Sequence, residues 1–143
     1  MELLVASDHA GFELKNALIK AVPEVSWKDL GPSAKDSVDY PDFADRVCKV
    51  ISRDENARGV LICGSGQGMV MRANRYPAVR AALVYNDEIT RLSRQHNNAN
   101  VLCLGARFAT VEQASQWVRI FLQTEFEGGR HSARVAKIDA PMK

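Results

Sequence analysis

A cysteine followed by closely spaced glycines is the segment of the sequence most suggestive of chemistry. In residues 61–69, LICGSGQGM, Cys63 ends an apolar stretch and three glycines fall within the next five positions. Small residues between a strand and a helix let several backbone N–H groups converge on one point in front of the helix. Such a loop stabilises negative charge, and a thiol beside it is a candidate base or nucleophile. The simpler interpretation is a packed cysteine before an ordinary turn, but the glycines favour a functional loop.

Three familiar phosphate-binding loops do not match this segment. A dinucleotide loop has the spacing GxGxxG after the first strand, whereas here GxGxG follows the third predicted strand and the first turn reads DHAG. A Walker loop requires lysine after its last glycine, and Met69 stands there. A cysteine-dependent phosphatase loop would need an arginine at this same position to clamp the phosphate. The ligand of the loop is therefore expected to be a different anion, present at least transiently.

Short apolar strands alternate with amphipathic helices along the whole chain. The expected strands are Leu3–Ser7, Val25–Leu30, Gly59–Cys63, Arg80–Val84 and Asn100–Leu104. The expected helices are 11–21, 41–52, 68–75, 87–96, 111–123 and 130–138. This alternation predicts a three-layer α/β fold with a five-stranded parallel, Rossmann-like sheet and a C-terminal helix. The length of 143 residues indicates a single domain over residues 1–143.

The fold class selects candidate site residues, because open parallel sheets bind ligands beyond the carboxyl ends of their strands. The first strand runs into Asp8 and His9, the third into the Cys63 loop and the fifth into Arg107. Taken alone, Asp8 is typical of a helix N-cap and His9 of a surface loop. The irregular segment 31–39 is expected to be a mobile loop beside the site.

Two segments further along the chain carry additional polar groups. His96 and Asn97, in SRQHNNANV, close the fourth predicted helix, where asparagines often serve as caps. Arg130 and Arg134, in EGGRHSARVAKID, lie one helical turn apart, so both guanidinium groups can reach a single anion. The alternative for the arginines is a solvated basic face.

Composition argues against nucleic acid as a partner and against a membrane or secreted location. Hydrophobic residues make up 46% and charged residues 25% of the chain, and the formal charge is +2. This charge is too small to indicate nucleic acid, and no apolar run is long enough for a membrane span. The N-terminal stretch does not resemble a secretory signal. The three cysteines, of which Cys48 and Cys103 are expected in the core, predict neither disulfides nor a metal site, and a cytoplasmic location fits them best.

The segments SDHAGFELK, DYPDFA, CGSGQGM, SRQHNNANVL and EGGRHSARV together resemble the type B ribose-5-phosphate isomerase family, which includes allose- and galactose-6-phosphate isomerases. The resemblance covers nearly the whole chain, with the motifs in matching order. It implies reversible conversion of D-ribose 5-phosphate to D-ribulose 5-phosphate, a step of the pentose phosphate pathway, through a cis-enediolate. It also implies that no metal or organic cofactor takes part. A six-carbon aldose 6-phosphate is the alternative substrate.

The resemblance also implies roles for individual residues. Asp8 and His96 are similar to the pair that opens the sugar ring, and Cys63 to the base that moves a proton between C2 and C1. The backbone of the glycine loop is similar to the family's anion hole for the enediolate. The loop residues concerned are Gly64, Gly66, Gln67, Gly68 and Met69. Ser65 holds a hydroxyl position that is threonine in many members. One branch places a glutamate base where this chain has Met69, which leaves Cys63 as the base here.

The remaining implied contacts concern the sugar and its phosphate. Tyr40 and Asn97 are similar to groups beside the sugar. The implied phosphate ligands are His9, Arg107, Arg130 and Arg134. The chemistry agrees with the glycine loop, because removing a proton next to a carbonyl places negative charge on oxygen, and preorganised N–H donors stabilise that charge.

Helix direction predicts that such a site is shared between two chains. Helices of this fold start at the carboxyl edge of the sheet, so His96 and Asn97, at the end of a helix of about ten residues, should lie roughly 15 Å from Cys63. The sequence therefore predicts a homodimer, or a tetramer built from it, with sites shared between subunits. The rival class is a non-catalytic module that binds sugar phosphates or nucleotides.

Overall fold

Five parallel strands form the centre of the protein, for which a computed structural model describes residues 2–142. The strands are β1 (Glu2–Ser7), β2 (Ser26–Asp29), β3 (Arg58–Cys63), β4 (Ala81–Leu83) and β5 (Val101–Gly105). Their order across the sheet is β2-β1-β3-β5-β4, and all neighbouring pairs are parallel. The central strand β3 therefore has a partner on each side, and its carboxyl end opens onto the edge where ligands bind in such folds.

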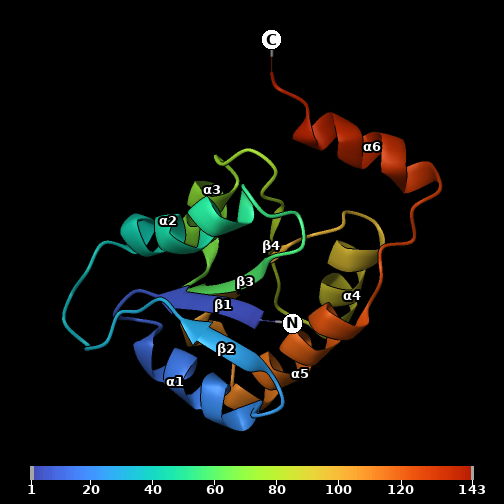
Figure 1. Cartoon of the computed structure of the whole chain (residues 1–143). Coiled ribbons are helices and arrows are strands. Elements are labelled where there is room, and N and C mark those ends of the chain that lie inside the picture. The colour runs from blue at the N-terminus through green and yellow to red at the C-terminus, as the bar shows by residue number, and fades with distance from the viewer. Residues whose placement is uncertain (1, 143) are drawn as a thin grey trace.

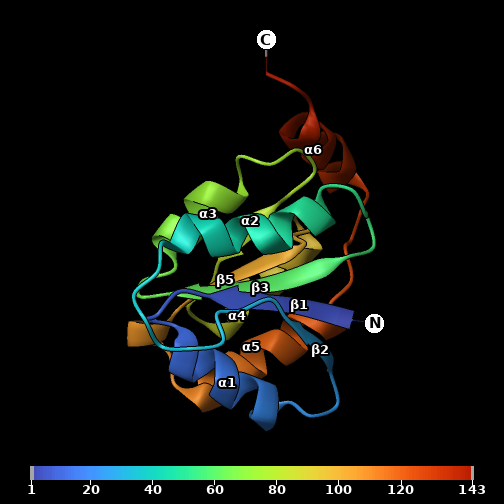
Figure 2. The ribbon, with the colours of Figure 1, turned by 60° about the vertical axis from the view of Figure 1, so that its left-hand side comes forward.

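Helices cover both faces of this sheet. They are α1 (Phe12–Ala21), α2 (Tyr40–Ile51), α3 (Gln67–Ala73), α4 (Asp87–Gln95), α5 (Val111–Gln123) and α6 (Arg130–Asp139), with a short 3-10 turn η1 at Ala106–Phe108. In Figures 1 and 2, α2 and α3 lie on one face of the sheet and α1 and α5 on the other, with α4 beside α5. The C-terminal α6 projects outside these layers.

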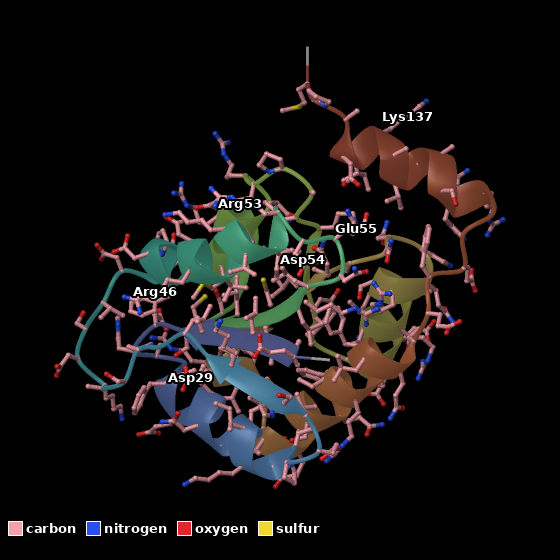
Figure 3. All side chains as sticks on the ribbon, viewed as in Figure 1. Asp29, Arg46, Arg53, Asp54, Glu55 and Lys137 are labelled. Atoms are coloured by element: carbon pink, nitrogen blue, oxygen red, sulfur yellow. The ribbon has the colours of Figure 1, made fainter. Side chains whose placement is uncertain are left out.

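Side-chain alternation along the strands explains the two cores. Val60 and Ile62 point toward α1 and α5, whereas Leu61 and Cys63 point toward α2 and α3, because successive strand residues face opposite sides. The inner strands are apolar at almost every position, as expected for a sheet buried on both faces. Charged side chains such as Arg53, Glu55 and Lys137 lie on the outside, where Figure 3 labels them.

The predicted fold class and all eleven predicted strands and helices are confirmed, with bounds that differ by at most two residues. The largest single difference is at the end of α3, which stops two residues before its predicted end, and the edge strands β2 and β4 are each one residue shorter than predicted at both ends. Each of them pairs on one side only. At Arg80, just before β4, the backbone N–H donates to the side chain of Asn100 at 2.8 Å. Within residues 2–142, no helix has the length and apolar character needed to cross a bilayer.

One local prediction was wrong. Asp8 is not the N-cap of α1, a position that Gly11 occupies without a side-chain bond. The Asp8 carboxylate instead accepts a hydrogen bond from the Gly11 N–H at 3.0 Å, which closes the turn before the helix. The helix begins later than predicted, and Asp8 is left at the edge of the sheet rather than on the first turn of α1.

A buried lysine joins β2 to α1. Lys15 is fully buried in α1, and its ammonium group donates to both carboxylate oxygens of Asp29 at 2.9 and 2.8 Å. A third bond, of 3.0 Å, goes to the carbonyl of Pro32. Asp29, labelled in Figure 3, also accepts from the N–H of Gly31 at 2.8 Å. This cluster fixes where the chain leaves the sheet for the segment 31–39.

Replacing the acid of this cluster should destabilise the protein. Asp29→Ala leaves the Lys15 ammonium buried with a single carbonyl partner, so we expect a loss of about 3 kcal/mol of unfolding free energy. Chemical denaturation would measure it. Asp29→Asn, which keeps an acceptor for Gly31, should lose less. The double variant Lys15→Met with Asp29→Ala should recover part of the loss, and an Asp29→Ala protein as stable as the parent would contradict this account.

Candidate active site

A cavity of about 310 Å³ opens at the carboxyl edge of the sheet, where β1, β3 and β5 end. Its walls combine an acid, an imidazole, a phenol, a thiol, a hydroxyl and a guanidinium group. The lining residues are Asp8, His9, Ala10, Tyr40, Cys63, Gly64, Ser65, Gly68 and Arg107. The structure thus brings together the predicted site residues that follow the first, third and fifth strands, together with Tyr40 at the start of α2.

Cys63 is the last residue of β3 and is 5% exposed. Its Sγ accepts a hydrogen bond from the Gly66 N–H at 3.2 Å, so the loop folds back over the sulfur. The other two cysteines are core residues, as predicted. Burial raises the pKa of the Cys48 thiol to about 12 and that of Cys103 well above its ordinary value. Those two thiols stay protonated at neutral pH, and Cys63 is the cysteine that lines the cavity.

Two glycines determine the shape of the loop. Gly66 adopts a left-handed conformation (φ 80°), and a Cβ there would lie 3.0 Å from the carbonyl carbon of Leu104. At Gly68 a Cβ would lie 2.5 Å from Cζ of Tyr40, because the tyrosine ring packs directly on this glycine. The first glycine allows the turn after β3, and the second allows Tyr40 to form a wall of the cavity.

Unused backbone donors lie at the start of α3. Within residues 2–142, the N–H groups of Gly68 and Met69 have no hydrogen-bond partner, as is usual for the first turn of a helix. Gln67 donates its N–H to the Ser65 hydroxyl at 3.4 Å. Met69 itself is fully buried beneath the loop. Free donors beside Cys63 are the feature that the glycine spacing predicted.

The turn after β1 provides the opposite wall. Asp8 is 7% exposed, and His9 accepts a hydrogen bond at Nδ1 from the Val38 N–H at 3.2 Å. An accepting Nδ1 places the imidazole proton on Nε2. The bond also attaches the segment 31–39 to the edge of the cavity, which confirms its predicted place beside the site; its mobility stays a prediction.

Arg107 completes the cavity from η1. Its backbone N–H donates to the carbonyl of Gly64 at 3.1 Å, and its guanidinium group lies over the same residue. The side chain is exposed, so the charge remains available to a ligand.

Four predicted site residues lie elsewhere: His96, Asn97, Arg130 and Arg134. His96 and Asn97 follow α4 and lead into the amino end of β5. Cys63 instead pairs with Gly105, at the carboxyl end of β5. The length of β5 separates the two edges by roughly 15 Å. Asn97 lines a separate cavity of about 190 Å³ together with Arg80 and Ile138. One chain alone therefore does not bring all the predicted residues together.

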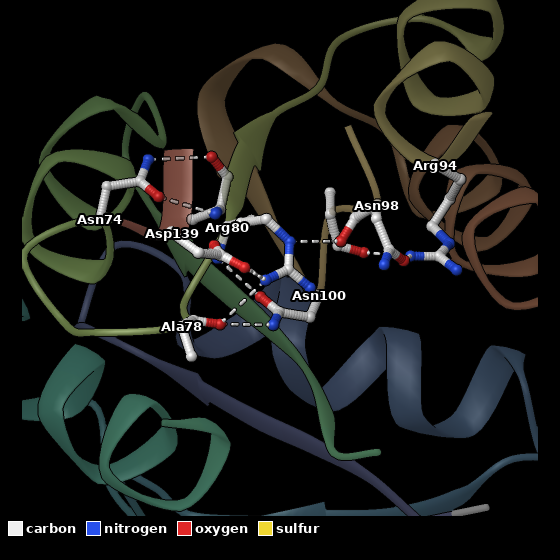
Figure 4. Close-up of polar contacts among 9 residues, drawn as sticks. Asn74, Ala78, Arg80, Arg94, Asn98, Asn100 and Asp139 are labelled. Atoms are coloured by element: carbon white, nitrogen blue, oxygen red, sulfur yellow. Dashed lines mark hydrogen bonds and ion pairs between the residues drawn. The ribbon is translucent and has the colours of Figure 1, made fainter. Parts of the chain in front are cut away.

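A polar network around Arg80, Asn98 and Asp139 lies next to these remote residues in the chain (Figure 4). Arg80 donates from Nε to the Asn98 carbonyl at 2.9 Å and forms an ion pair of 2.9 Å with Asp139, at the end of α6. Arg94 donates to the side chain of Asn98 at 2.9 Å and to the carbonyl of Thr124 at 3.1 Å. Burial lowers the pKa of Arg94 to about 10, so it stays charged at neutral pH. The ends of α4, α5 and α6 are thus tied to one edge.

On α6 itself, Arg130 and Arg134 are exposed, whereas His131 and Val135 are buried. The helix projects from the layers in both ribbon views (Figures 1 and 2). Its two arginines are not among the residues that line the cavity at Cys63 of their own chain.

Comparison with known proteins decides the family. The model of the family described as Ribose/Galactose Isomerase matches residues 3–138. A probable ribose-5-phosphate isomerase B of Mycoplasma pneumoniae is 45% identical, over 96% of this chain and 93% of the relative. The chain belongs to the Ribose/Galactose Isomerase family. The family resemblance that the sequence motifs predicted is therefore confirmed.

Solved structures of relatives agree with the fold. A ribose 5-phosphate isomerase from Thermotoga maritima has a TM-score of 0.93 and 44% identity, with 96% of this chain and 97% of that chain covered. The Mycoplasma genitalium ribose-5-phosphate isomerase B with bound ribulose-5-phosphate has a TM-score of 0.92 and 42% identity, covering 96% and 93% of the two chains.

Some neighbours of the predicted site residues could not be found by sequence spacing. Glu127 and His131 lie beside His96 only because the chain returns to the end of α4 after α5. Gly11 packs its backbone against the Ile62 carbonyl, where a Cβ would lie at 2.6 Å. The glycine in the DHAG turn was a signal for this close approach, although its partner was not readable from the sequence.

The glycines of the loop should respond differently to alanine. Gly66→Ala forces an alanine into the left-handed conformation and brings its Cβ against backbone atoms of Leu104. We therefore expect a loss of about 3 kcal/mol in unfolding free energy. Gly68→Ala should change stability far less, because the half-exposed Tyr40 ring can swing outward and open the cavity. Chemical denaturation would compare the two, with Gly64→Ala as control, since its Cβ would lie 3.4 Å from Arg107. Equal stability of the Gly66 and Gly64 variants would refute the close approach at Gly66.

Proposed function

We propose that this protein interconverts D-ribose 5-phosphate and D-ribulose 5-phosphate. The observation that carries the proposal is the likeness to the Mycoplasma genitalium isomerase with bound ribulose-5-phosphate, at 42% identity over 96% of this chain. The cavity at Cys63 supports it, because its acid, thiol, imidazole and guanidinium groups suit a phosphorylated sugar.

In the proposed reaction Cys63 is the base. Its thiolate removes the proton from C2 of the open-chain aldose, the C1–C2 double bond forms, and O1 takes the negative charge. Return of the proton at C1 and transfer of the O2 proton to O1 then yield the ketose. The free N–H groups of Gly68 and Met69 support an anion hole for the enediolate, and one such donor is typically worth about 10²–10³ in rate. Ser65 is the nearby hydroxyl suited to the transfer between the oxygens.

The ring-opening and phosphate contacts require a second copy of the chain. We propose that Asp8 of one subunit works with His96 of the partner subunit to open the furanose ring, and that Asn97 contacts a sugar hydroxyl. His9 and Arg107 bind the phosphate from the cavity side, and Arg130 and Arg134 on the projecting α6 approach it from the other chain. The position of these groups at the opposite edge of their own sheet supports a homodimer with two shared sites.

Cys63→Ala should abolish proton transfer but leave phosphate binding nearly intact. With ribose 5-phosphate in D₂O, the parent should form ketose and carry deuterium at C1 or C2, and the variant should do neither, because a positioned base contributes about 10²–10⁴. Cys48→Ala, on the buried face of α2, is the matched thiol control. Arg134→Ala should raise KM first. Cysteine-variant activity above about a tenth of the parent's would require another base.

The same assay separates the alternative functions. A non-catalytic sugar-phosphate module would form no ketose and incorporate no label. Values of kcat/KM for ribose, allose and galactose phosphates would decide between five- and six-carbon substrates, since one additional CHOH unit changes the required depth of the pocket and leaves the proton transfer unchanged.

Mixing two inactive variants should test the shared site. After subunit exchange between Cys63→Ala and His96→Ala proteins, half of the dimers are mixed, and each mixed dimer has one intact site of two. We therefore expect about a quarter of the parental activity. Each variant taken alone through the same exchange is the control. If every mixture stays inactive although exchange is verified by mass spectrometry, both residues must act within one chain.

A further inference from the structure

Three potential metal ligands converge where α6 meets the end of α4. His131 Nε2 lies 3.4 Å from Oε1 of Glu127, and His96 Nε2 lies 3.8 Å from the same oxygen. One ligand atom from each residue falls within 4.8 Å of the others. The two imidazole rings stack at 4.3 Å between centroids, with an angle of 15° between their planes.

The separation of 3.4 Å between His131 and Glu127 matches the edge of a coordination polyhedron better than a hydrogen bond, and the 3.8 Å between His96 and Glu127 is somewhat longer than such an edge. An N–H···O bond spans about 2.7–3.2 Å. Ligands bound at about 2.1 Å around a tetrahedral zinc ion stand about 3.4 Å apart. Within residues 2–142, none of the three side chains makes a hydrogen bond, although the His131 side chain is only 9% exposed. The nearly buried His131 imidazole thus faces the Glu127 carboxylate at 3.4 Å without a hydrogen bond to it.

The backbone holds the three residues in this arrangement. The Glu127 N–H donates to the Gln95 carbonyl at 3.1 Å, and the His131 N–H donates to the Gly128 carbonyl at 3.0 Å. The ion pair between Arg80 and Asp139 fixes the far end of α6. The ligands therefore come from two separate segments whose relative position is set before any ion binds.

We propose that His96, Glu127 and His131 form a binding site for zinc or a similar divalent transition metal. Two imidazoles and one carboxylate suit such ions, whereas magnesium and calcium prefer all-oxygen sites. The half-exposed Glu127 leaves a fourth position open to water. Binding requires the His96 ring to turn out of the stack so that its nitrogen lone pair points at the ion. That side chain is 39% exposed and has room to turn, whereas His131 stays in place.

The metal would act as an inhibitor. An ion that takes the His96 nitrogen removes it from the partner's cavity, so ring opening slows while Cys63 and the phosphate ligands remain intact. This consequence rests on the proposed function, whereas binding of the ion does not. The cluster lies outside the cavity at Cys63, which it shares no residue with.

Competition for Zn²⁺ against a chromophoric chelator tests the site. The measurement uses the full chain with Cys63→Ala, which removes the thiol that would compete for zinc. We expect one ion per chain, and a loss of affinity of about tenfold or more in Glu127→Gln and in His131→Asn. Glu125→Gln, an exposed carboxylate two residues away, is the matched control and should bind as the parent does. Circular dichroism would verify that each variant is folded, and Glu127→Gln changes no buried group.

The outcomes are distinguishable. Failure to bind zinc at micromolar concentration, or binding that neither Glu127→Gln nor His131→Asn weakens, overturns the site. With the Cys63 thiol restored, micromolar Zn²⁺ should slow the isomerase, and Glu127→Gln should relieve that inhibition. A chain that binds zinc through these residues but isomerises no sugar phosphate would keep the metal site and reject the proposed function. A chain that isomerises sugar phosphates but binds no zinc would keep the proposed function and reject the metal site.

Discussion

The turn after β3 can form in this way only because residue 66 has no side chain. Its backbone is left-handed and lies against the Leu104 carbonyl, where β5 ends. From that position its N–H reaches the sulfur of Cys63, and α3 starts one residue later. The depth of the cavity, the direction of the free N–H groups and the place of Tyr40 over Gly68 all follow from this one close approach. A larger residue at this point would move the helix and the loop away from the sheet.

Strand and helix direction impose a second constraint, which divides the site. In a parallel sheet with crossover helices, strand ends and helix ends lie at opposite edges. Asp8, Cys63 and Arg107 follow strands and meet at one edge, whereas His96 and Asn97 follow a helix and lie at the other. No adjustment of side chains joins the two groups across the length of β5. In the proposed function, a second copy of the chain would bring these two groups of residues together.

Sequence periodicity predicted the sheet, the helices and the residues at the carboxyl edge, because all of these depend on local alternation and strand order. It did not predict contacts between distant segments. Lys15 is typical of an exposed helix position in the sequence, yet it is buried because Asp29 lies across from it on β2. The Asp8 error has a similar origin, since the carboxylate closes a turn before the helix, which begins at Phe12 and not directly after Asp8. His131 stood in a recognised motif, but its neighbours His96 and Glu127 depend on how the chain returns after α5.

Hydrogen bonds and an ion pair connect charged groups at the edge of the sheet where β5 begins. Arg94 is almost fully buried and donates to oxygens of residues 98, 99 and 124, while Arg80 joins Asn98 to Asp139. Two buried or half-buried cations thus bind carbonyls at the ends of α4 and α5 and a carboxylate at the end of α6. These bonds join the segment that carries His96 and Asn97 to α6 as one unit. In the proposed dimer this unit would carry the ring-opening imidazole and both phosphate arginines together, so their mutual spacing would be set before the chains associate. The interface between the two chains would then determine only how this unit lies against the partner's cavity.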